Sequence, residues 1–259
     1  MTLPVLVLGL EKTGEETAAV LRREGVDVTV VEEHPSGSEY EQRTRATGAT
    51  VLEGAPGDRC AVAPPGIDTA RFQVTPAPKS HLVLSAGRLV WEKGHQDVLR
   101  AVAWLRREGS DVRALIVGAG PEEARLHAHA SDLRVADAVE WRTAVPYGEM
   151  PDLFARASCF VLASLPTSFW EEQFGMVLAE AAASGLPLVA ASSGAIPEVL
   201  DGHGRLFPPG DWQALAAALA DVTGSAPARV DHGELVRRYS VEAAAERYVA
   251  AYERVLSSK

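Results

Sequence analysis

Short apolar runs alternate with amphipathic stretches of helical length along most of this chain, and the alternation limits its fold more than any other feature. Runs such as residues 82–85 and 159–163 are too short for helices and too uniformly apolar for a half-exposed sheet. The stretches between them, such as residues 95–107, repeat apolar residues at helical spacing. Strict alternation of this kind predicts a parallel, doubly wound α/β sheet.

From residue 81 onward the pattern specifies the individual elements. We expect strands at 82–85, 113–117, 138–141, 159–163 and 187–190, with a further one near Leu206. We expect helices at 95–107, 121–130, 150–157, 175–183, 212–222 and 241–256, with a short helix after Ile196.

The N-terminal part shows the same alternation on a smaller scale. Strands are expected at 5–8, 26–31 and 49–52, with a helix at 13–24 and a weaker one at 39–47. This is a βαβαβ unit of about 55 residues, a half-Rossmann module. A proline-rich connection follows, containing Pro56, Pro64, Pro65, Pro76 and Pro78. We therefore predict two Rossmann-like parallel sheets, a small N-terminal domain over 1–75 and a larger domain over 76–259.

Composition excludes several classes of protein. The 25 basic and 35 acidic side chains give a net charge of −10, which disfavours nucleic acid as a partner. Apolar stretches are interrupted well before the ~18 to 20 residues that a membrane helix requires, so we expect no transmembrane segment. The apolar start has no basic residues ahead of it and is expected to form a strand, not a signal peptide. Cys60 and Cys159 lie far apart, which fits packing residues in a reducing, cytoplasmic compartment.

The first glycine-bounded loop is GLEKTG at residues 9–14, between a predicted strand and helix. Such a loop can turn its backbone N–H groups toward a phosphate. Glu11, however, stands where the second glycine of a phosphate loop is expected, and no Lys followed by Ser or Thr comes after Gly14, so the loop does not support ATP chemistry. A purely structural turn is the alternative.

The second loop runs from Gly87 to Gly94, and its two cations, Arg88 and Lys93, are five residues apart. Two cations that converge on one diphosphate would stabilise the charge that builds up as a phosphate leaves. The alternative is a pair of solvated loop charges.

The third feature is a pair of glutamates, Glu172 and Glu180, separated by seven residues at the start of a predicted helix. The helix N-terminus would direct peptide N–H groups into the cleft that the first carboxylate faces. Carboxylates accept hydrogen bonds from sugar hydroxyls. Helix capping together with a surface glutamate would explain the spacing equally simply.

These features occur in one ordered series with further glycine and proline motifs. The series is Gly87-Arg88 with Lys93-Gly94, Gly118-Ala119-Gly120-Pro121, Glu172 through Glu180, Gly185-Leu186-Pro187, Gly194 with Pro197-Glu198, and Pro208-Pro209-Gly210-Asp211. It closely resembles the C-terminal, nucleotide-sugar-binding domain of family-4 retaining glycosyltransferases of the GT-B fold. The resemblance covers residues 61–257, and residues 65–72 look like the interdomain connection of that family.

The resemblance implies roles for particular residues. Arg88 and Lys93 would hold the donor diphosphate, Glu172 would hold hydroxyls of the donor sugar, and these three form the predicted catalytic set. The predicted donor-binding set is Gly87, Gly118, Gly120, Arg142, Thr143, Gln173, Phe174, Gly175, Met176, Val177 and Glu180, with Glu180 on the ribose hydroxyls. The helix at 241–256 would cross back to the N-terminal domain. The implied ligand is a nucleotide or nucleotide sugar, with a UDP type favoured and no cofactor.

Residues 1–54 resemble a different family, the N-terminal domain of UDP-N-acetylmuramoyl-L-alanine:D-glutamate ligase. That resemblance implies a phosphate loop of Gly9, Lys12, Thr13 and Gly14, and a contact with the base from Glu32 or Glu33. It carries over no ligase reaction, because the ATP-binding central domain has no counterpart here. An acceptor domain of the usual GT-B size is also missing, and the two resemblances together predict an engineered chimera.

No metal site is expected. The sequence has no Asp-x-Asp pair, and His127 and His129 are two residues apart, on different faces of a helix. No Gly-x-Ser-x-Gly elbow is present either, so hydrolase chemistry lacks a nucleophile.

Three hypotheses follow from the sequence. The first is a GT-B-like protein that binds a nucleotide or nucleotide sugar but turns it over weakly, for lack of a full acceptor domain. The second is an active retaining glycosyltransferase with a nucleotide-sugar donor, and the third is a folded scaffold without ligand affinity. The acceptor is unknown in all three.

Overall fold

The computed structural model describes the backbone of residues 5–8, 28–32, 50–53, 64–79 and 81–257, and the side chains of residues 64–79 and 81–250. The chain separates into two compact units, Met1–Val62 and Ala63–Lys259, which we consider separately. The division of the chain into domains 1–75 and 76–259 stays a prediction.

In the first unit, three parallel strands form a small sheet in the order β1-β2-β3. They are β1 (Val5–Leu8), β2 (Val28–Glu32) and β3 (Thr50–Glu53), each within two residues of its predicted start. The predicted helices at 13–24 and 39–47 and the glycine loop at 9–14 lie outside the described residues. The Rossmann-like nature of this unit therefore stays a prediction.

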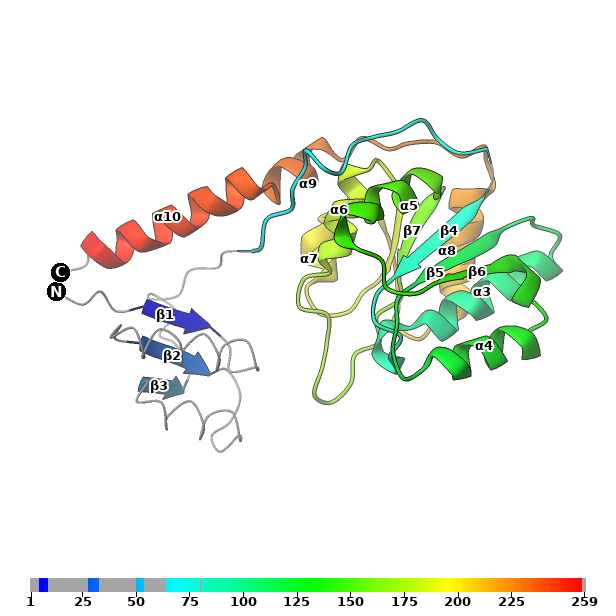
Figure 1. Cartoon of the computed structure of the whole chain (residues 1–259), viewed down its shortest axis with the longest axis horizontal. Coiled ribbons are helices and arrows are strands. Elements are labelled where there is room, and N and C mark those ends of the chain that lie inside the picture. The colour runs from blue at the N-terminus through cyan, green and yellow to red at the C-terminus, as the bar shows by residue number, and fades with distance from the viewer. Residues whose placement is uncertain (1–4, 9–27, 33–49, 54–63, 80, 258–259) are drawn as a thin grey trace. The chain divides into compact units, whose positions relative to one another are not determined.

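In the second unit, six strands form a parallel sheet in the order β6-β5-β4-β7-β8-β9 (Figure 1). The strands are β4 (Leu82–Ala86), β5 (Arg113–Val117), β6 (Val139–Arg142), β7 (Cys159–Leu162), β8 (Leu188–Ala191) and β9 (Arg205–Phe207). Every residue of β4, β7 and β8 is buried, as expected for parallel strands covered on both faces. Between β4 and β7 the order of the strands reverses, which makes this pair the topological switch point of the sheet.

Helices cover both faces of this sheet (Figure 1). On one face, residues of α3 (His95–Arg107), α4 (Glu123–Asp132) and α8 (Trp212–Thr223) form a core with Val83. On the other, α5 (Met150–Arg156), α6 (Met176–Ala183), α7 (Ile196–Leu200) and α9 (Gly233–Arg238) pack with Leu84. The alternation of Val83 and Leu84 between the two cores is the two-residue period of a strand. The predicted doubly wound sheet is confirmed.

The remaining elements are short 3₁₀ helices and the last helix. The 3₁₀ helices are η2 (Trp91–Lys93), η3 (Ala136–Ala138) and η4 (Tyr147–Glu149), and the last helix is α10 (Val241–Ser257). The predicted helix at 241–256 is thus present, whereas its crossing to the N-terminal part stays a prediction. Sequence periodicity did not predict α9, which is only six residues long. Within the described part of the chain, no helix is both long and apolar enough to cross a membrane.

The part of the proline-rich connection that the structure describes, residues 64–79, belongs to the second unit and is held against its helices and loops. Ile67 donates its backbone N–H to Tyr239 O and accepts from Val241 N, and both Ile67 and Phe72 are buried. The Arg229 guanidinium donates to the carbonyl oxygens of Thr75, Pro76, Ala155 and Ala157. These contacts replace the regular secondary structure that the prolines exclude.

Candidate functional site

A groove of about 530 Å³ opens at the carboxyl ends of β4 and β5, next to the switch point. Its walls come from the loops after β4, β5, β6 and β7 and from the start of α6. The lining residues are Ala86, Gly87, Arg88, Lys93, Val117, Gly118, Ala119, Ala144, Val145, Tyr147, Met150, Glu172, Gly175, Met176, Val177 and Glu180. Doubly wound sheets bind their ligands at this position, because the loops on either side of a switch point diverge and leave a crevice.

The floor of the groove consists of two loops packed backbone against backbone. Gly87 N donates to Val117 O, and Leu89 N donates to Ala119 O. A Cβ at Gly118 would lie 1.9 Å from Gly87 O, and one at Gly120 would lie 2.4 Å from Leu89 O. Both glycines are therefore needed for the close approach of the loops. Gly120 does not line the groove, so its role is to support the floor.

An ion pair joins two of the three predicted catalytic side chains, Lys93 and Glu172, across 79 residues of sequence. Lys93 Nζ lies 2.6 Å from Glu172 Oε2, and the two side chains are only 15% and 10% exposed. The hydroxyl of Ser164 donates to the same oxygen at 2.7 Å, and the Trp170 ring lies 5.0 Å from the ammonium. Lysine and serine thus fix one carboxylate oxygen, and no described residue donates a hydrogen bond to the other.

Arg88 is the second cation of the groove. Its side chain is exposed, and within residues 64–79 and 81–250 it forms no ion pair or side-chain hydrogen bond. The structure therefore brings Arg88, Lys93 and Glu172 to one groove, as the sequence predicts, with one cation paired and the other free to meet an anion.

The predicted donor-binding residues divide into two groups. Six of them line the groove: Gly87, Gly118, Gly175, Met176, Val177 and Glu180. Five others do not, namely Gly120, Arg142, Thr143, Gln173 and Phe174. Arg142 is exposed and pairs with Glu140 at 3.1 Å, whereas the ring of Phe174 packs edge-on against Tyr239.

Glu180 is buried on α6 and accepts a hydrogen bond from the hydroxyl of Tyr147 at 2.9 Å. Burial raises the pKa of Glu180, and the hydrogen bond from Tyr147 opposes that shift. Sequence reasoning missed Tyr147, Ser164 and Trp170, which surround the two glutamates. The signal that could have found Ser164 is its place just beyond the carboxyl end of β7, where ligand-facing side chains collect.

His95 is a buried histidine beneath the loop that carries Arg88. Its Nδ1 lies 3.0 Å from Ser85 Oγ, and its Nε2 lies 3.3 Å from the carbonyl oxygen of Arg88. Burial lowers the pKa of His95 to about 4, with Lys93 adding to the shift and the hydrogen bond to the Arg88 carbonyl opposing it. The imidazole is therefore neutral at pH 7 and supports the loop through hydrogen bonds.

This burial gives a prediction for acid stability. Between pH ~6.5 and pH ~4 the unfolded chain binds a proton at His95 that the folded chain does not, so stability falls as the pH drops, by roughly 3 kcal/mol for this group. We expect His95→Gln to lose less unfolding free energy than the wild type over this range, measured by urea titrations at each pH. His127→Gln, at an exposed position, is the control. Equal pH dependence in all three proteins would contradict the prediction.

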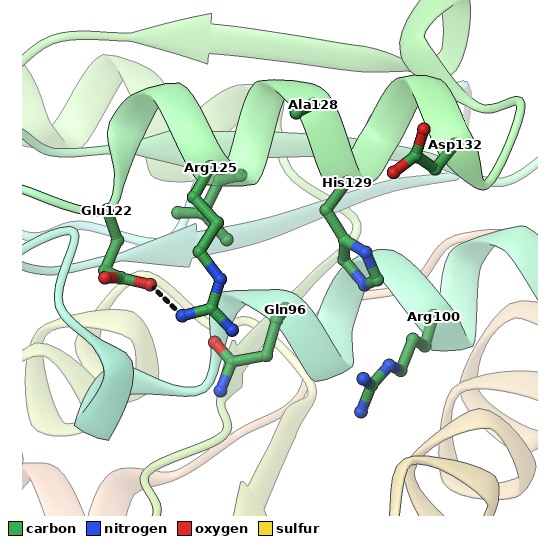
Figure 2. Close-up of a pocket in the computed structure, with 8 residues that line it drawn as sticks. Gln96, Arg100, Glu122, Arg125, Ala128, His129 and Asp132 are labelled. Atoms are coloured by element: carbon green, nitrogen blue, oxygen red, sulfur yellow. Dashed lines mark hydrogen bonds and ion pairs between the residues drawn. The ribbon is translucent and has the colours of Figure 1, made fainter.

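A second hollow, of about 230 Å³, lies between α3 and α4, away from the groove (Figure 2). His129 points from α4 toward α3 there, whereas His127 stacks on Trp141 with ring centroids 4.1 Å apart. The two histidines face different ways, as their spacing predicts. No cluster of three metal-ligating side chains occurs in the part of the chain that the structure describes. Cys159 is a free, buried thiol there, and Cys60 lies outside the described residues.

The sheet order and the groove define a doubly wound α/β domain with a ligand site at its switch point. A family model described as glycosyl transferases group 1 matches residues 66–246, most of the chain. The chain belongs to that family. The match confirms the C-terminal glycosyltransferase domain that the motif series predicts; the ligase-like module and the chimeric origin stay predictions.

Curated relatives include a GDP-mannose-dependent alpha-(1-6)-phosphatidylinositol monomannoside mannosyltransferase of Mycolicibacterium smegmatis. It is 36% identical over 174 residues, covering 61% of this chain and 46% of that protein. A D-inositol 3-phosphate glycosyltransferase of Paenarthrobacter aurescens is 32% identical over 212 residues, covering 72% of this chain and 48% of that protein. The chain thus spans about half the length of the curated relatives it matches.

Solved structures share the fold at lower identity. Sucrose-phosphate synthase from Thermosynechococcus elongatus matches with a TM-score of 0.66 at 22% identity, covering 96% of this chain and 63% of that one. The C-terminal domain of a glycosyl transferase group 1 protein from Francisella tularensis matches with a TM-score of 0.53 at 21% identity, covering 72% of this chain and 98% of that one. These likenesses establish a GT-B-like α/β fold with a six-stranded parallel sheet.

Proposed function

We propose that residues 63–259 form the donor-binding half of a glycosyltransferase and that the chain transfers a glycosyl unit from a nucleoside diphosphate sugar. The observation that carries this proposal is the groove, in which a free cation, a paired cation and two glutamates meet. Membership of the group 1 family and relatives named as glycosyltransferases support the same activity.

The groove offers a distinct group to each part of such a donor. Arg88 and Lys93 would bind the diphosphate and stabilise its negative charge as the sugar departs. Lys93 and Ser164 both donate hydrogen bonds to Oε2 of Glu172, so its other oxygen, Oε1, would accept a hydrogen bond from a sugar hydroxyl. Glu180, buried at the far wall, would accept from the ribose hydroxyls. In the retaining mechanism that the motif resemblance implies, this arrangement stabilises an oxocarbenium-like transition state.

Weak turnover is the first of the three hypotheses that the sequence suggests. The comparisons give that ranking no support, since the relatives are named for transfer reactions, and active transfer becomes the first hypothesis. The acceptor stays unknown. The ligase-like origin of residues 1–54, its phosphate loop at Gly9, Lys12, Thr13 and Gly14, the chimera and the cytoplasmic location remain parts of this proposal.

The test is calorimetric titration of the full chain with UDP, GDP and their sugar conjugates, beside an assay of donor hydrolysis. UDP is the ligand type that the motifs favour, while GDP-mannose is named for one relative. We expect saturable binding of one of them, and Arg88→Ala to weaken it about tenfold or more through loss of a charge-assisted contact. Arg125→Ala, outside the groove, should leave affinity unchanged. Absence of binding, or equal affinity in both variants, would remove the assignment of the groove.

A further inference from the structure

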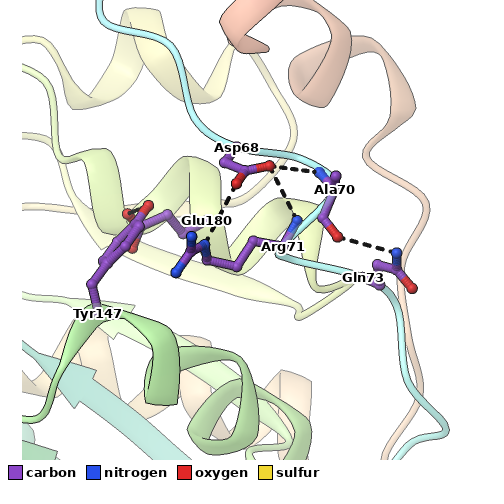
Figure 3. Close-up of polar contacts among 6 residues, drawn as sticks. All are labelled: Asp68, Ala70, Arg71, Gln73, Tyr147 and Glu180. Carbon is purple, nitrogen blue, oxygen red and sulfur yellow. Dashed lines mark hydrogen bonds and ion pairs between the residues drawn. The ribbon is translucent and has the colours of Figure 1, made fainter.

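Tyr147 forms a direct link between the connecting segment and the buried glutamate of the groove (Figure 3). Its hydroxyl donates to Glu180 Oε1 at 2.9 Å, and both side chains line the groove. The two residues come from different elements, η4 after β6 and helix α6, and are 33 positions apart. No described residue donates to the other carboxylate oxygen, Oε2.

The tyrosine ring is itself held in place by the connecting segment. The Arg71 guanidinium lies 5.1 Å from the ring centroid, and Asp68 holds that guanidinium at 3.5 Å (Figure 3). Phe72, fully buried, meets the ring edge-on at 5.6 Å. Tyr147 is nonetheless 46% exposed, and these two neighbours restrict its rotamer together with the hydrogen bond to Glu180. Residues 68–72 thereby reach Glu180 through one aromatic side chain.

We propose that Tyr147 is a positioning residue that fixes the carboxylate of Glu180 for the ribose cis-diol of the donor, and that Arg71 holds Tyr147 in place. This inference rests on the proposed function, because it needs a ribose-bearing ligand in the groove. A carboxylate with one oxygen tethered by the phenol presents Oε2 in a fixed direction, so binding a diol loses less side-chain entropy. Without the phenol, the buried carboxylate keeps no hydrogen-bond donor among the described residues.

The electrostatic surroundings of Glu180 agree with this role. Tyr147 faces it from η4, and Arg71, which contacts the Tyr147 ring, is paired with Asp68. Lys93 and Glu172, which also line the groove, are paired with each other. Because burial raises the pKa of Glu180 and the phenol opposes that shift, loss of the phenol raises the pKa further. Less of the carboxylate is then ionised at mildly acidic pH.

The first experiment measures UDP and GDP binding to Tyr147→Phe between pH 5 and pH 8. We expect roughly five- to tenfold weaker binding at pH 7, from loss of a hydrogen bond to a charged group, and a larger deficit at pH 5. The 2′,3′-dideoxy nucleotides, which lack the diol, should bind Tyr147→Phe and wild type equally. Arg71→Gln should show a smaller loss of the same kind. Its matched control is Arg125→Gln, a guanidinium over Trp91 and paired with Glu122 in the same manner, which should show none.

The outcomes separate this inference from the proposed function. If wild type binds neither nucleotide, the proposed function fails. Binding by Tyr147→Phe that is equal to that of wild type would overturn the positioning role. Tighter binding would also overturn it, and would show that the tyrosine blocks the site. A second measurement needs no ligand: carboxyl ¹³C NMR titration, with the Glu180 signal identified by its absence in Glu180→Gln. The pKa of Glu180 should be higher in Tyr147→Phe than in wild type, and an unchanged pKa would overturn the inference.

Discussion

Replacing Lys93 by methionine is expected to weaken nucleoside diphosphate binding by about 100-fold or more. Lys93 lines the groove with its ammonium 2.6 Å from Glu172, and removing the ammonium leaves a nearly buried carboxylate facing the incoming anion. Loss of a cation that meets a bound anion in a desolvated site costs about 2 to 5 kcal/mol of binding free energy. The attraction between the ammonium and the diphosphate is lost, and repulsion between Glu172 and the diphosphate is gained. Titration calorimetry with UDP and GDP measures the loss. Lys79→Met, in the exposed part of the connection, is the matched control.

The same substitution is expected to lower stability, which a double-mutant cycle separates from the effect on binding. Lys93→Met leaves Glu172 with only the hydroxyl of Ser164, at a cost of roughly 2 to 4 kcal/mol of unfolding free energy. The double variant with Glu172→Gln carries no unpaired charge, so it should regain most of that stability and the part of the affinity that repulsion removed, but not the part that the ammonium supplied. Normal affinity in Lys93→Met, or full recovery of wild-type affinity in the double variant, would show that the lysine serves only the fold.

Periodicity was sufficient to predict the sheet because parallel strands covered on both faces carry an unbroken apolar signal. Helix α3 and strand β5 begin and end where the pattern places them. The loops that follow the strands are equally well marked, since the approach between Gly87 and Gly118 leaves no room for a side chain. The sequence therefore locates the glycine loops and the two cations, Arg88 and Lys93, that one of them carries.

Side chains beyond those loops depend on tertiary contacts that no local pattern encodes. Arg142 belongs to the predicted donor-binding set, but Glu140 lies two residues earlier on the same side of β6 and pairs with it. Phe174 packs on Tyr239, at the end of a helix too short to produce a periodic signal. Tyr147 reaches Glu180 only because Arg71 and Phe72 hold its ring, and that segment was interpreted as a plain connection.

The second large effect is expected at Gly94, which joins η2 to α3 with a φ of 67°. A Cβ at this position would lie 1.8 Å from the carbonyl oxygen of Ala163, directly after β7. The backbone at the start of α3 therefore packs directly against the backbone of the loop after β7. The hydrogen bond from Leu165 N to Glu92 O, 2.7 Å long, joins that loop to the loop after β4. Gly94→Ala must therefore separate the loops that carry Lys93 and Glu172, in addition to straining the backbone.

We expect Gly94→Ala to lose roughly 3 to 5 kcal/mol of unfolding free energy, from overpacking and left-handed strain together. Gly109→Ala is the matched control, because Gly109 also has a positive φ, of 92°, but nothing lies within 4 Å of the position that its Cβ would take. Strain alone should cost it about 1 to 2 kcal/mol. Urea unfolding of both variants measures the difference. Equal losses of unfolding free energy in the two variants would mean that the loop at Ala163 moves to accommodate the methyl group. The contact between Gly94 and Ala163 would then not determine the spacing of Lys93 and Glu172.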